Sequence, residues 1–138
     1  CRFGDPEAQV VLPLLDCDLL EVMIAVSEGR LADADVRIRD GCAACVIVAS
    51  GGYPGKYQTG YEISVPEDAA DSIIYAGVRA SGNKIFTSGG RVLGVTATAK
   101  TLKEALDEAY AKAAKVKFEN AFYRRDIGKK ALCAAEAK

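Results

Sequence analysis

Several short stretches of this sequence hold residues whose types and spacing could do chemistry. The first, Arg-Phe-Gly-Asp-Pro-Glu at residues 2–7, places Arg2, Asp5 and Glu7 around one glycine. At the mouth of a helix, where backbone N–H groups are free, such a cluster suits a phosphate or carboxylate ligand. The alternative is a helix cap with an incidental ion pair. We favour ligand binding, because Arg2 and Asp5 flank a tight Phe-Gly joint.

Two glycine clusters could also offer backbone N–H groups to an anion. They are Ser-Gly-Gly-Tyr-Pro-Gly at residues 50–55 and Ser-Gly-Gly-Arg at residues 88–91. Neither matches a nucleotide-binding glycine motif, and neither lies between a strand and a helix. Taken alone, both are interpreted as turns, and the second is predicted to have hairpin geometry.

A third candidate is Phe-Tyr-Arg-Arg-Asp-Ile-Gly at residues 122–128, which holds two adjacent Arg and Asp126. The sequence is equally compatible with a surface ion pair and with an Arg that faces a phosphate and is oriented by Asp126.

The Cys42-Ala-Ala-Cys45 spacing is that of a redox dithiol or of half a zinc site. It opens an apolar run that we expect to be a strand, in which residues three apart point to opposite faces and their sulfurs diverge. A zinc site needs further ligands, and the sequence has no His and no second such motif. We therefore interpret both as small core residues, with a thiol or zinc protein as the alternative.

Composition narrows the function classes. The chain has 138 residues, half of them apolar, which is typical of a globular protein. Its net charge of −1 gives no footprint for nucleic acid or an anionic membrane, and no apolar run approaches the roughly 18 residues of a membrane span. Five Cys, an odd number, do not suggest a secreted disulfide framework, so we expect the cytoplasm. The absence of His leaves carboxylates, Arg, Lys, hydroxyls, Cys and backbone amides for any chemistry.

The elements that position these groups follow two patterns. Up to about residue 30 the apolar spacing is helical, with Asp5 as the expected N-cap, Pro6 at the first helical position and Gly29 as a C-cap. Pro13 should kink or split this helix. From residue 42 the pattern is one of short strands and glycine turns, followed by a helix that Thr101 opens with a capping box.

We therefore predict an α+β fold in two parts. Residues 1–39 form a helical part, and residues 40–138 form a domain with an antiparallel sheet and packed helices.

Four segments carry a resemblance to a known family: "CRFGDPEAQVVLPLL", "VASGGYPGKYQTGYEI", "GGRVLGVTA" and "FENAFYRRDIG". In order and spacing the chain resembles the glycinamide ribonucleotide synthetases, or phosphoribosylamine–glycine ligases, of the ATP-grasp superfamily. One departure is Tyr75-Ala-Gly-Val, where such enzymes commonly carry His-Ala-Gly-Thr. A role that the family assigns to that His would therefore not carry over to Tyr75 of this chain.

The resemblance implies a reaction of de novo purine biosynthesis. Glycine is phosphorylated by MgATP, and the amine of phosphoribosylamine attacks the glycyl phosphate to give glycinamide ribonucleotide, ADP and phosphate. The family's Mg²⁺ ligands, a Glu and an Asn, would lie just before Cys1. Residues 1–39 would then be the end of the ATP-grasp domain. The chain would be a C-terminal portion that binds neither Mg²⁺ nor ATP tightly alone and is inactive without the upstream domains.

Carried over onto this sequence, the family's motifs make Arg2 and Asp5 the catalytic candidates. Arg2 would face glycyl phosphate or a substrate phosphate, and Asp5 would contact substrate or orient Arg2. Residues Gly51, Gly52 and Tyr53 would form the loop nearest the phosphoribosyl group, with Arg124 as a further substrate-binding candidate. The alternative function is a stand-alone module that binds a phosphoribosyl ligand or a partner chain without catalysis.

Overall fold

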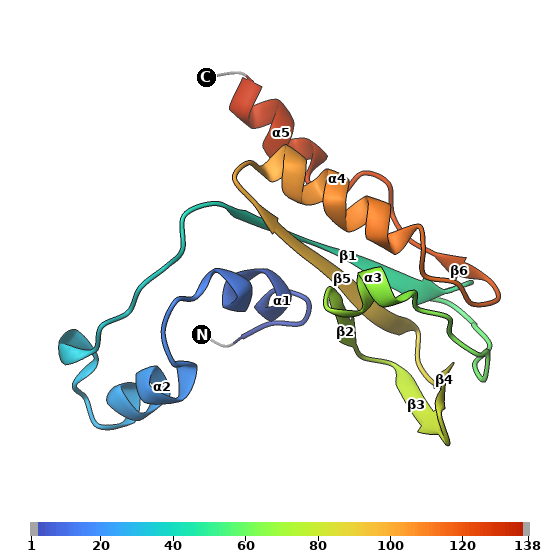
Figure 1. The fold of residues 1–138 in the computed structure, drawn as a ribbon, viewed down its shortest axis with the longest axis horizontal. Coiled ribbons are helices and arrows are strands. Elements are labelled where there is room, and N and C mark those ends of the chain that lie inside the picture. Colours follow the sequence, from blue (N-terminus) through green and yellow to red (C-terminus); the bar gives the residue numbers. More distant parts are fainter. Residues whose placement is uncertain (1–2, 137–138) are drawn as a thin grey trace.

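The fold consists of a helical N-terminal arm and a twisted sheet covered by one long helix (Figure 1). A computed structural model describes residues 3–136. In chain order the elements are α1 (Ala8–Val11), η1 (Leu12–Leu14), α2 (Leu19–Ser27), η2 (Leu31–Asp33), β1 (Cys42–Ser50), α3 (Glu67–Ala70), β2 (Ile73–Tyr75), β3 (Val78–Ser81), β4 (Lys84–Thr87), β5 (Arg91–Ala99), α4 (Leu102–Ala113), β6 (Ala121–Phe122) and α5 (Lys129–Glu136).

Four strands form an antiparallel sheet in the order β2-β5-β1-β6, and β3 pairs with β4 in a separate two-stranded sheet. The long strands β1 and β5 pair over almost their whole length, with Val46 opposite Val95. β6 pairs only with Ala49 and Ser50. Within the described residues, the edge of β1 from Cys42 to Val48 therefore has no strand partner. Mixed helices and antiparallel strands confirm the predicted α+β class.

The core lies between one face of this sheet and α4. Val46, Leu93 and Val95 are fully buried on that face, and burying each such side chain stabilises the fold by roughly 1.5–3 kcal/mol. The helix contributes mostly alanines, which allow it to approach the strands closely: Ala105, Leu106, Ala109 and Ala113 are its buried residues.

The start of α4 is as the sequence predicts. The Thr101 hydroxyl accepts a hydrogen bond from the Glu104 N–H, and the Glu104 carboxylate accepts one from the Thr101 N–H. The two groups satisfy otherwise unpaired amides at the helix start. The expected capping box is confirmed.

The N-terminal helical run is split at Pro13, as predicted. α1 passes into the short 3-10 helix η1, which contains Pro13, and the chain is extended at Leu15. Helix α2 then starts anew with Asp18 as its N-cap, whose carboxylate accepts from the Leu20 N–H at 2.8 Å. A proline without an N–H cannot continue the helical hydrogen bonds, and this explains the break.

Gly29 ends α2 as predicted. It has a φ of +70°, the left-handed conformation that glycine adopts without strain. The Gly29 N–H donates to the Val26 carbonyl, and the Arg30 N–H donates to the Ala25 carbonyl. This pair of bonds is the Schellman arrangement that terminates helices.

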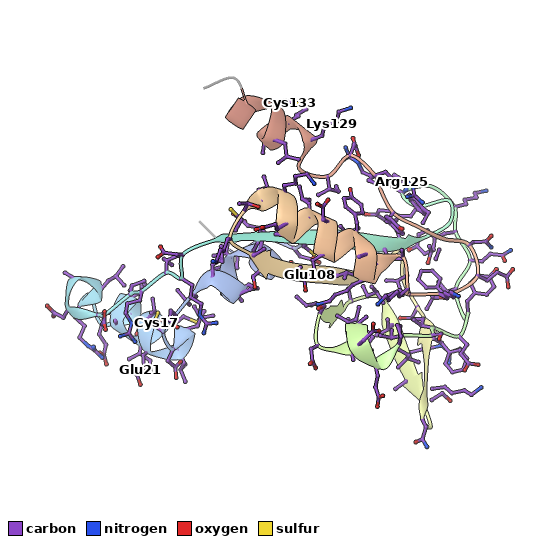
Figure 2. All side chains as sticks on the ribbon, turned by 45° about the horizontal axis from the view of Figure 1, so that its top comes forward. Cys17, Glu21, Glu108, Arg125, Lys129 and Cys133 are labelled. Atoms are coloured by element: carbon purple, nitrogen blue, oxygen red, sulfur yellow. The ribbon has the colours of Figure 1, made fainter. Side chains whose placement is uncertain are left out.

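The arm that carries α2 lies apart from the sheet (Figure 1), and Figure 2 shows its Cys17 and Glu21 far from Arg125 and Lys129. Its apolar stripe is mostly exposed: Leu20 is 63%, Met23 53% and Val26 57% exposed. No helix among residues 3–136 has the length and apolar character to cross a membrane.

The expected helix start at Asp5 and Pro6 is wrong. Helix α1 begins at Ala8, with Glu7 as its N-cap and no side-chain capping bond. The Asp5 carboxylate is engaged elsewhere, as described below. Since α1 is only four residues long, it does not provide the anion-binding helix mouth that the sequence suggested.

The hairpin expected at Gly89 and Gly90 is also wrong. β4 pairs with β3, whereas β5 pairs with β1 and β2, so these glycines connect two different sheets. The Ser88 and Gly89 N–H groups both donate to the Gly77 carbonyl, which fixes this crossing.

Candidate functional site

A cavity of about 760 Å³ lies along the free edge of β1. One wall comes from the start of the arm, with Pro6 and Glu7, and another from the glycine loop, with Tyr53. Arg91 at the start of β5 and Arg124 after β6 complete its polar lining. Four segments that the sequence singles out, at residues 2–7, 50–55, 88–91 and 122–128, thus contribute to one cavity.

Asp5 lies beside this cavity and is held by Arg91. The Arg91 guanidinium donates from Nη1 to the Asp5 carbonyl at 2.9 Å and from Nη2 to Asp5 Oδ2 at 2.8 Å. The other carboxylate oxygen, Oδ1, accepts from Gln9 Nε2 at 3.0 Å. Both carboxylate oxygens of Asp5 therefore have hydrogen-bond partners. A substrate bound by Asp5 would share these oxygens with Arg91 and Gln9. Arg2 lies outside the described residues, so its predicted role stays a prediction.

The glycine loop after β1 needs glycine at two positions. A Cβ on Gly51 would lie 2.8 Å from the Asn120 carbonyl oxygen. Gly52 has a φ of +96°, and a Cβ there would lie 2.2 Å from the Lys56 carbonyl oxygen. These contacts explain both glycines by local geometry, as the turn interpretation expects.

The loop places its residues on two different hollows. Tyr53 lines the large cavity, whereas Gly51 lines a second cavity of about 370 Å³ with Lys56 and Tyr57. Gly52 lines neither of the two. The rings of Tyr53 and Tyr57 meet edge to face with centroids 6.1 Å apart. The structure therefore places only Tyr53 of the three with Arg124.

Arg124 forms a two-pronged ion pair with Asp126. Arg124 Nε donates to Asp126 Oδ1 at 2.9 Å, and Nη2 donates to Oδ2 at 2.7 Å. These hydrogen bonds lower the pKa of Asp126 below its ordinary value and raise the pKa of Arg124. The Arg124 side chain is 69% exposed, so the pair adds little to stability. The surface ion pair, one of the two alternatives that the sequence leaves open, is present; a phosphate contact stays a prediction.

The segment that carries Arg124 is tied to α4. The Tyr110 hydroxyl donates to the Arg124 carbonyl at 2.9 Å and accepts from the Ile127 N–H at 3.0 Å. Tyr110 also packs at 6.0 Å, between ring centroids, against Tyr123. One tyrosine on the long helix thus sets where this wall of the cavity lies.

Cys42 and Cys45 behave as strand residues. Both lie in β1, opposite Ala99 and Thr96, and both are free. The prediction that they are core residues is wrong: both are only half-buried and lie outside the buried cluster, and Cys45 lines the large cavity. Burial raises the pKa of the Cys45 thiol. A Cβ on the neighbouring Gly94 would lie 2.9 Å from Cys45 Sγ, so the thiol fills the space that this glycine leaves. Among residues 3–136, no group of three or more Cys, Asp or Glu side chains is placed to hold a metal ion.

Comparison with known families decides where the chain belongs. The family model "Phosphoribosylglycinamide synthetase, C domain" matches residues 43–130, most of the chain. The chain belongs to this family. The resemblance seen in the sequence motifs is thereby confirmed.

Known relatives of this synthetase family match the chain over nearly its whole length. A phosphoribosylamine–glycine ligase from Chlorobaculum tepidum is 47% identical over 95% of this chain and 32% of the relative. A bifunctional purine biosynthetic protein from Dictyostelium discoideum is 44% identical over all of this chain and 18% of the relative. The crystal structure of phosphoribosylamine–glycine ligase from Thermotoga maritima matches with a TM-score of 0.73 and 38% identity, over 91% of this chain and 31% of that one.

The chain spans about a third of the length of the phosphoribosylamine–glycine ligases it matches. The part of those proteins that corresponds to it is their C domain together with the segment before it.

Sequence reasoning misses two residues that hold Asp5 at this site, Arg91 in the synthetase C domain and Gln9 in the segment before it. The sequence pattern interprets Arg91 as part of a turn and assigns no role to Gln9. The only signal for Arg91 is its position, directly after two glycines at the start of a buried strand. Its partner Asp5 lies 86 residues earlier. At this separation, the spacing of two residues in the sequence does not predict that they are in contact.

Proposed function

We propose that this chain works as the C-terminal part of an ATP-dependent phosphoribosylamine–glycine ligase of de novo purine biosynthesis. Support comes from the family match, from relatives of that name that align along nearly the whole chain, and from the share of their length that it spans. In the complete protein, glycine would be activated by ATP as glycyl phosphate. The amine of phosphoribosylamine would then displace phosphate to give glycinamide ribonucleotide.

One observation about the site carries the assignment of residues. The cavity of about 760 Å³ brings together the Asp5 segment, Tyr53 and Arg124, which come from three separate motifs. We assign the Asp5 side to the catalytic end, together with Arg2. Tyr53 and Arg124 form the substrate side, with Gly51 and Gly52 shaping the loop. An arginine and an aromatic side chain that line the same cavity suit a phosphorylated sugar, because Arg can bind phosphate with two hydrogen bonds.

ATP and Mg²⁺ would enter with the upstream part of the complete protein. Bound Mg²⁺ neutralises phosphate charge during phosphoryl transfer. We assign no described residue as a Mg²⁺ ligand and place those ligands before Cys1.

We further propose that residues 1–39 complete the ATP-grasp domain of the longer protein. The exposed stripe of Leu20, Met23 and Val26 on α2 supports this assignment. Three large apolar side chains on one short helix are costly to leave in water, and a neighbouring domain would cover them.

The test compares the 138-residue chain with the complete protein in one assay. ADP formation is measured with glycine and phosphoribosylamine present, and again with each left out. The proposal expects ADP and glycinamide ribonucleotide from the complete protein only when both are present, and none from the chain alone. Turnover by the chain alone would overturn its role as a part, and a complete protein inactive with both substrates would overturn the ligase assignment.

Titration calorimetry of the chain with ribose 5-phosphate tests the alternative function, a stand-alone module that binds a phosphoribosyl ligand without catalysis. Binding by the chain at micromolar ligand, together with a complete protein that lacks ligase activity, would favour that alternative.

A further inference from the structure

Arg91 connects the loop at residues 3–7 to the start of β5. We infer that Arg91 is a positioning residue: it holds Asp5, and with it the Phe-Gly-Asp-Pro-Glu loop at residues 3–7, where the ligase reaction needs them. This inference rests on the proposed function and extends it to a residue of the C-terminal sheet. It means that this sheet, besides lining the substrate cavity, sets the geometry of the catalytic loop.

The contact has a shape that constrains the loop. Arg91 binds the main-chain carbonyl and the side-chain carboxylate of the same residue, at 2.9 and 2.8 Å. Two bonds from one planar group fix both the position of the Asp5 backbone and the rotamer of its side chain. The Arg91 side chain is 37% exposed, against 69% for Arg124 in the other two-pronged pair, so water competes less for it.

The loop itself is stabilised only over short distances. The Gly4 N–H donates to Glu7 Oε2 at 3.1 Å, and the Ala8 N–H donates to the Gly4 carbonyl at 2.8 Å. Gln9 adds the bond to Asp5 Oδ1. Within the described residues, both hydrogen bonds that join residues 3–11 to the sheet come from Arg91. The internal hydrogen bonds set the conformation of the loop, and the two bonds from Arg91 set its position relative to the sheet.

Arg91 is itself held rigidly. It pairs with Ala49 in β1, and its carbonyl accepts from the Gly77 N–H at 2.9 Å. The preceding Gly90 carbonyl accepts from the Ser50 N–H at 2.8 Å. A residue whose backbone is held by β1 and by Gly77 can transmit its position to the loop, whereas a side chain on a free loop could not.

The predicted substrate loop at residues 50–53 contacts Gly89 and Gly90, the two residues before Arg91. The Ser50 hydroxyl donates to the Gly89 carbonyl at 2.9 Å. Tyr53 lies so close to Gly90 that a Cβ there would come within 2.2 Å of the ring. Movement of the Ser-Gly-Gly-Tyr loop is thereby coupled to the backbone that carries Arg91, and through it to Asp5.

The inference is tested in the complete protein with Arg91→Gln, Arg91→Lys and Asp5→Asn. Arg79→Gln is the matched control, because Arg79 is an exposed arginine of β3 that lies over the Phe86 ring, outside the cavity. Misplacing a reacting group by about 1 Å can cost about 100-fold in rate. We therefore expect Arg91→Gln to lower kcat by roughly 10- to 100-fold with the KM for ATP nearly unchanged, and Arg79→Gln to change kcat less than about 2-fold.

Lysine keeps the charge but cannot bridge two acceptors in a plane, so Arg91→Lys should restore only part of kcat. The double variant Arg91→Gln/Asp5→Asn should be no slower than the slower single variant, because both substitutions remove the same ion pair. Fully multiplied losses in the double variant, or a normal kcat for Arg91→Gln, would overturn the inference.

Amide hydrogen exchange tests the positioning role of Arg91 without relying on ligase activity, and it distinguishes that role from an effect on folding. In the complete protein, Arg91→Gln should speed exchange of the amides at residues 4–8 and leave β1 protected. Unchanged exchange at residues 4–8 would overturn the inference even if the ligase is active. If the wild-type complete protein lacks ligase activity but this exchange effect is seen, the proposed function fails while the positioning contact stands. Loss of protection throughout β1 in Arg91→Gln and Arg91→Lys alike would show a folding role instead.

Discussion

Tyr53 packs its ring directly on the backbone of Gly90: a Cβ at Gly90 would lie 2.2 Å from Tyr53 Cδ2 and 3.0 Å from Tyr57 Cε1. This contact joins the glycine loop after β1 to the crossing between the two sheets. Gly90 directly precedes Arg91. The candidate substrate loop and the candidate catalytic loop therefore both contact the same backbone segment.

We expect Gly90→Ala to destabilise the chain by about 1–3 kcal/mol, because the ring must move to admit a methyl group. Urea denaturation measures the loss. In a Tyr53→Ala background, where part of the obstacle is gone, the same substitution should cost clearly less. Equal costs in the two backgrounds would show that Tyr53 does not press on Gly90.

Gly52→Ala should destabilise the chain more than Gly29→Ala. Both glycines have positive φ, +96° and +70°, so both substitutions strain the backbone by about 1 kcal/mol. Only at Gly52 would the new methyl also meet a main-chain carbonyl at 2.2 Å; nothing lies within 4 Å at Gly29. Comparison of the two urea midpoints measures the difference, and a Gly29→Ala variant that loses as much would contradict the predicted clash.

Asp126 should titrate below the ordinary carboxyl range because of its hydrogen bonds with Arg124. A lowered folded-state pKa means that this pair supports the fold above the pKa of an unfolded Asp, and that the support is lost as pH falls through the folded-state pKa. In Arg124→Gln the pKa of Asp126 should rise, as followed by carboxyl NMR. The matched control is Lys115→Gln, which should raise the pKa of Asp68 and leave Asp126 unchanged.

Cys45 should react slowly with iodoacetamide at pH 8. Burial raises the pKa of its thiol, and the thiolate is the reactive form. Cys133 on α5 is exposed (Figure 2) and serves as the internal reference. Peptide mass spectrometry after timed labelling should find Cys133 modified first; a Cys45 labelled at the same rate would show that partial burial does not protect its thiol.

Charged substitutions on α2 should separate folding from domain assembly. Met23→Lys should change the stability of the 138-residue chain by no more than about 0.5 kcal/mol, since Met23 is already 53% exposed to water. In the complete protein the same change should lower the melting temperature, because the proposed neighbouring domain would have to cover a charge. An unchanged melting temperature there would argue that the stripe stays exposed.

Much of the fold is predictable from the sequence because its signals are local. Thr101 and Glu104 stand at the spacing of a capping box, Pro13 breaks the helical run, and residues 42–50 form one apolar strand. Each signal acts within a few residues of itself. The formation of each of those elements therefore depends little on long-range contacts, whereas their arrangement in the sheet depends on pairings such as that of β1 with β5.

The site could be predicted only in part. Its motifs point to the right segments, but Asp5 is placed by Arg91 through a contact that sequence spacing does not encode. The Asp-Pro-Glu order favours a helix cap locally, and the tertiary ion pair with Arg91 takes the carboxylate instead. At Gly89 and Gly90 the local pattern cannot distinguish a hairpin from a crossing, because both need glycine.

The short length of β6 has a practical consequence. From Cys42 to Val48, the outer hydrogen-bonding groups of β1 have no neighbouring strand within the described residues. An open strand edge with small apolar side chains can recruit the same edge of another molecule. Work on this region by itself therefore faces a risk of β-sheet aggregation, and a lysine placed on that edge is the natural safeguard.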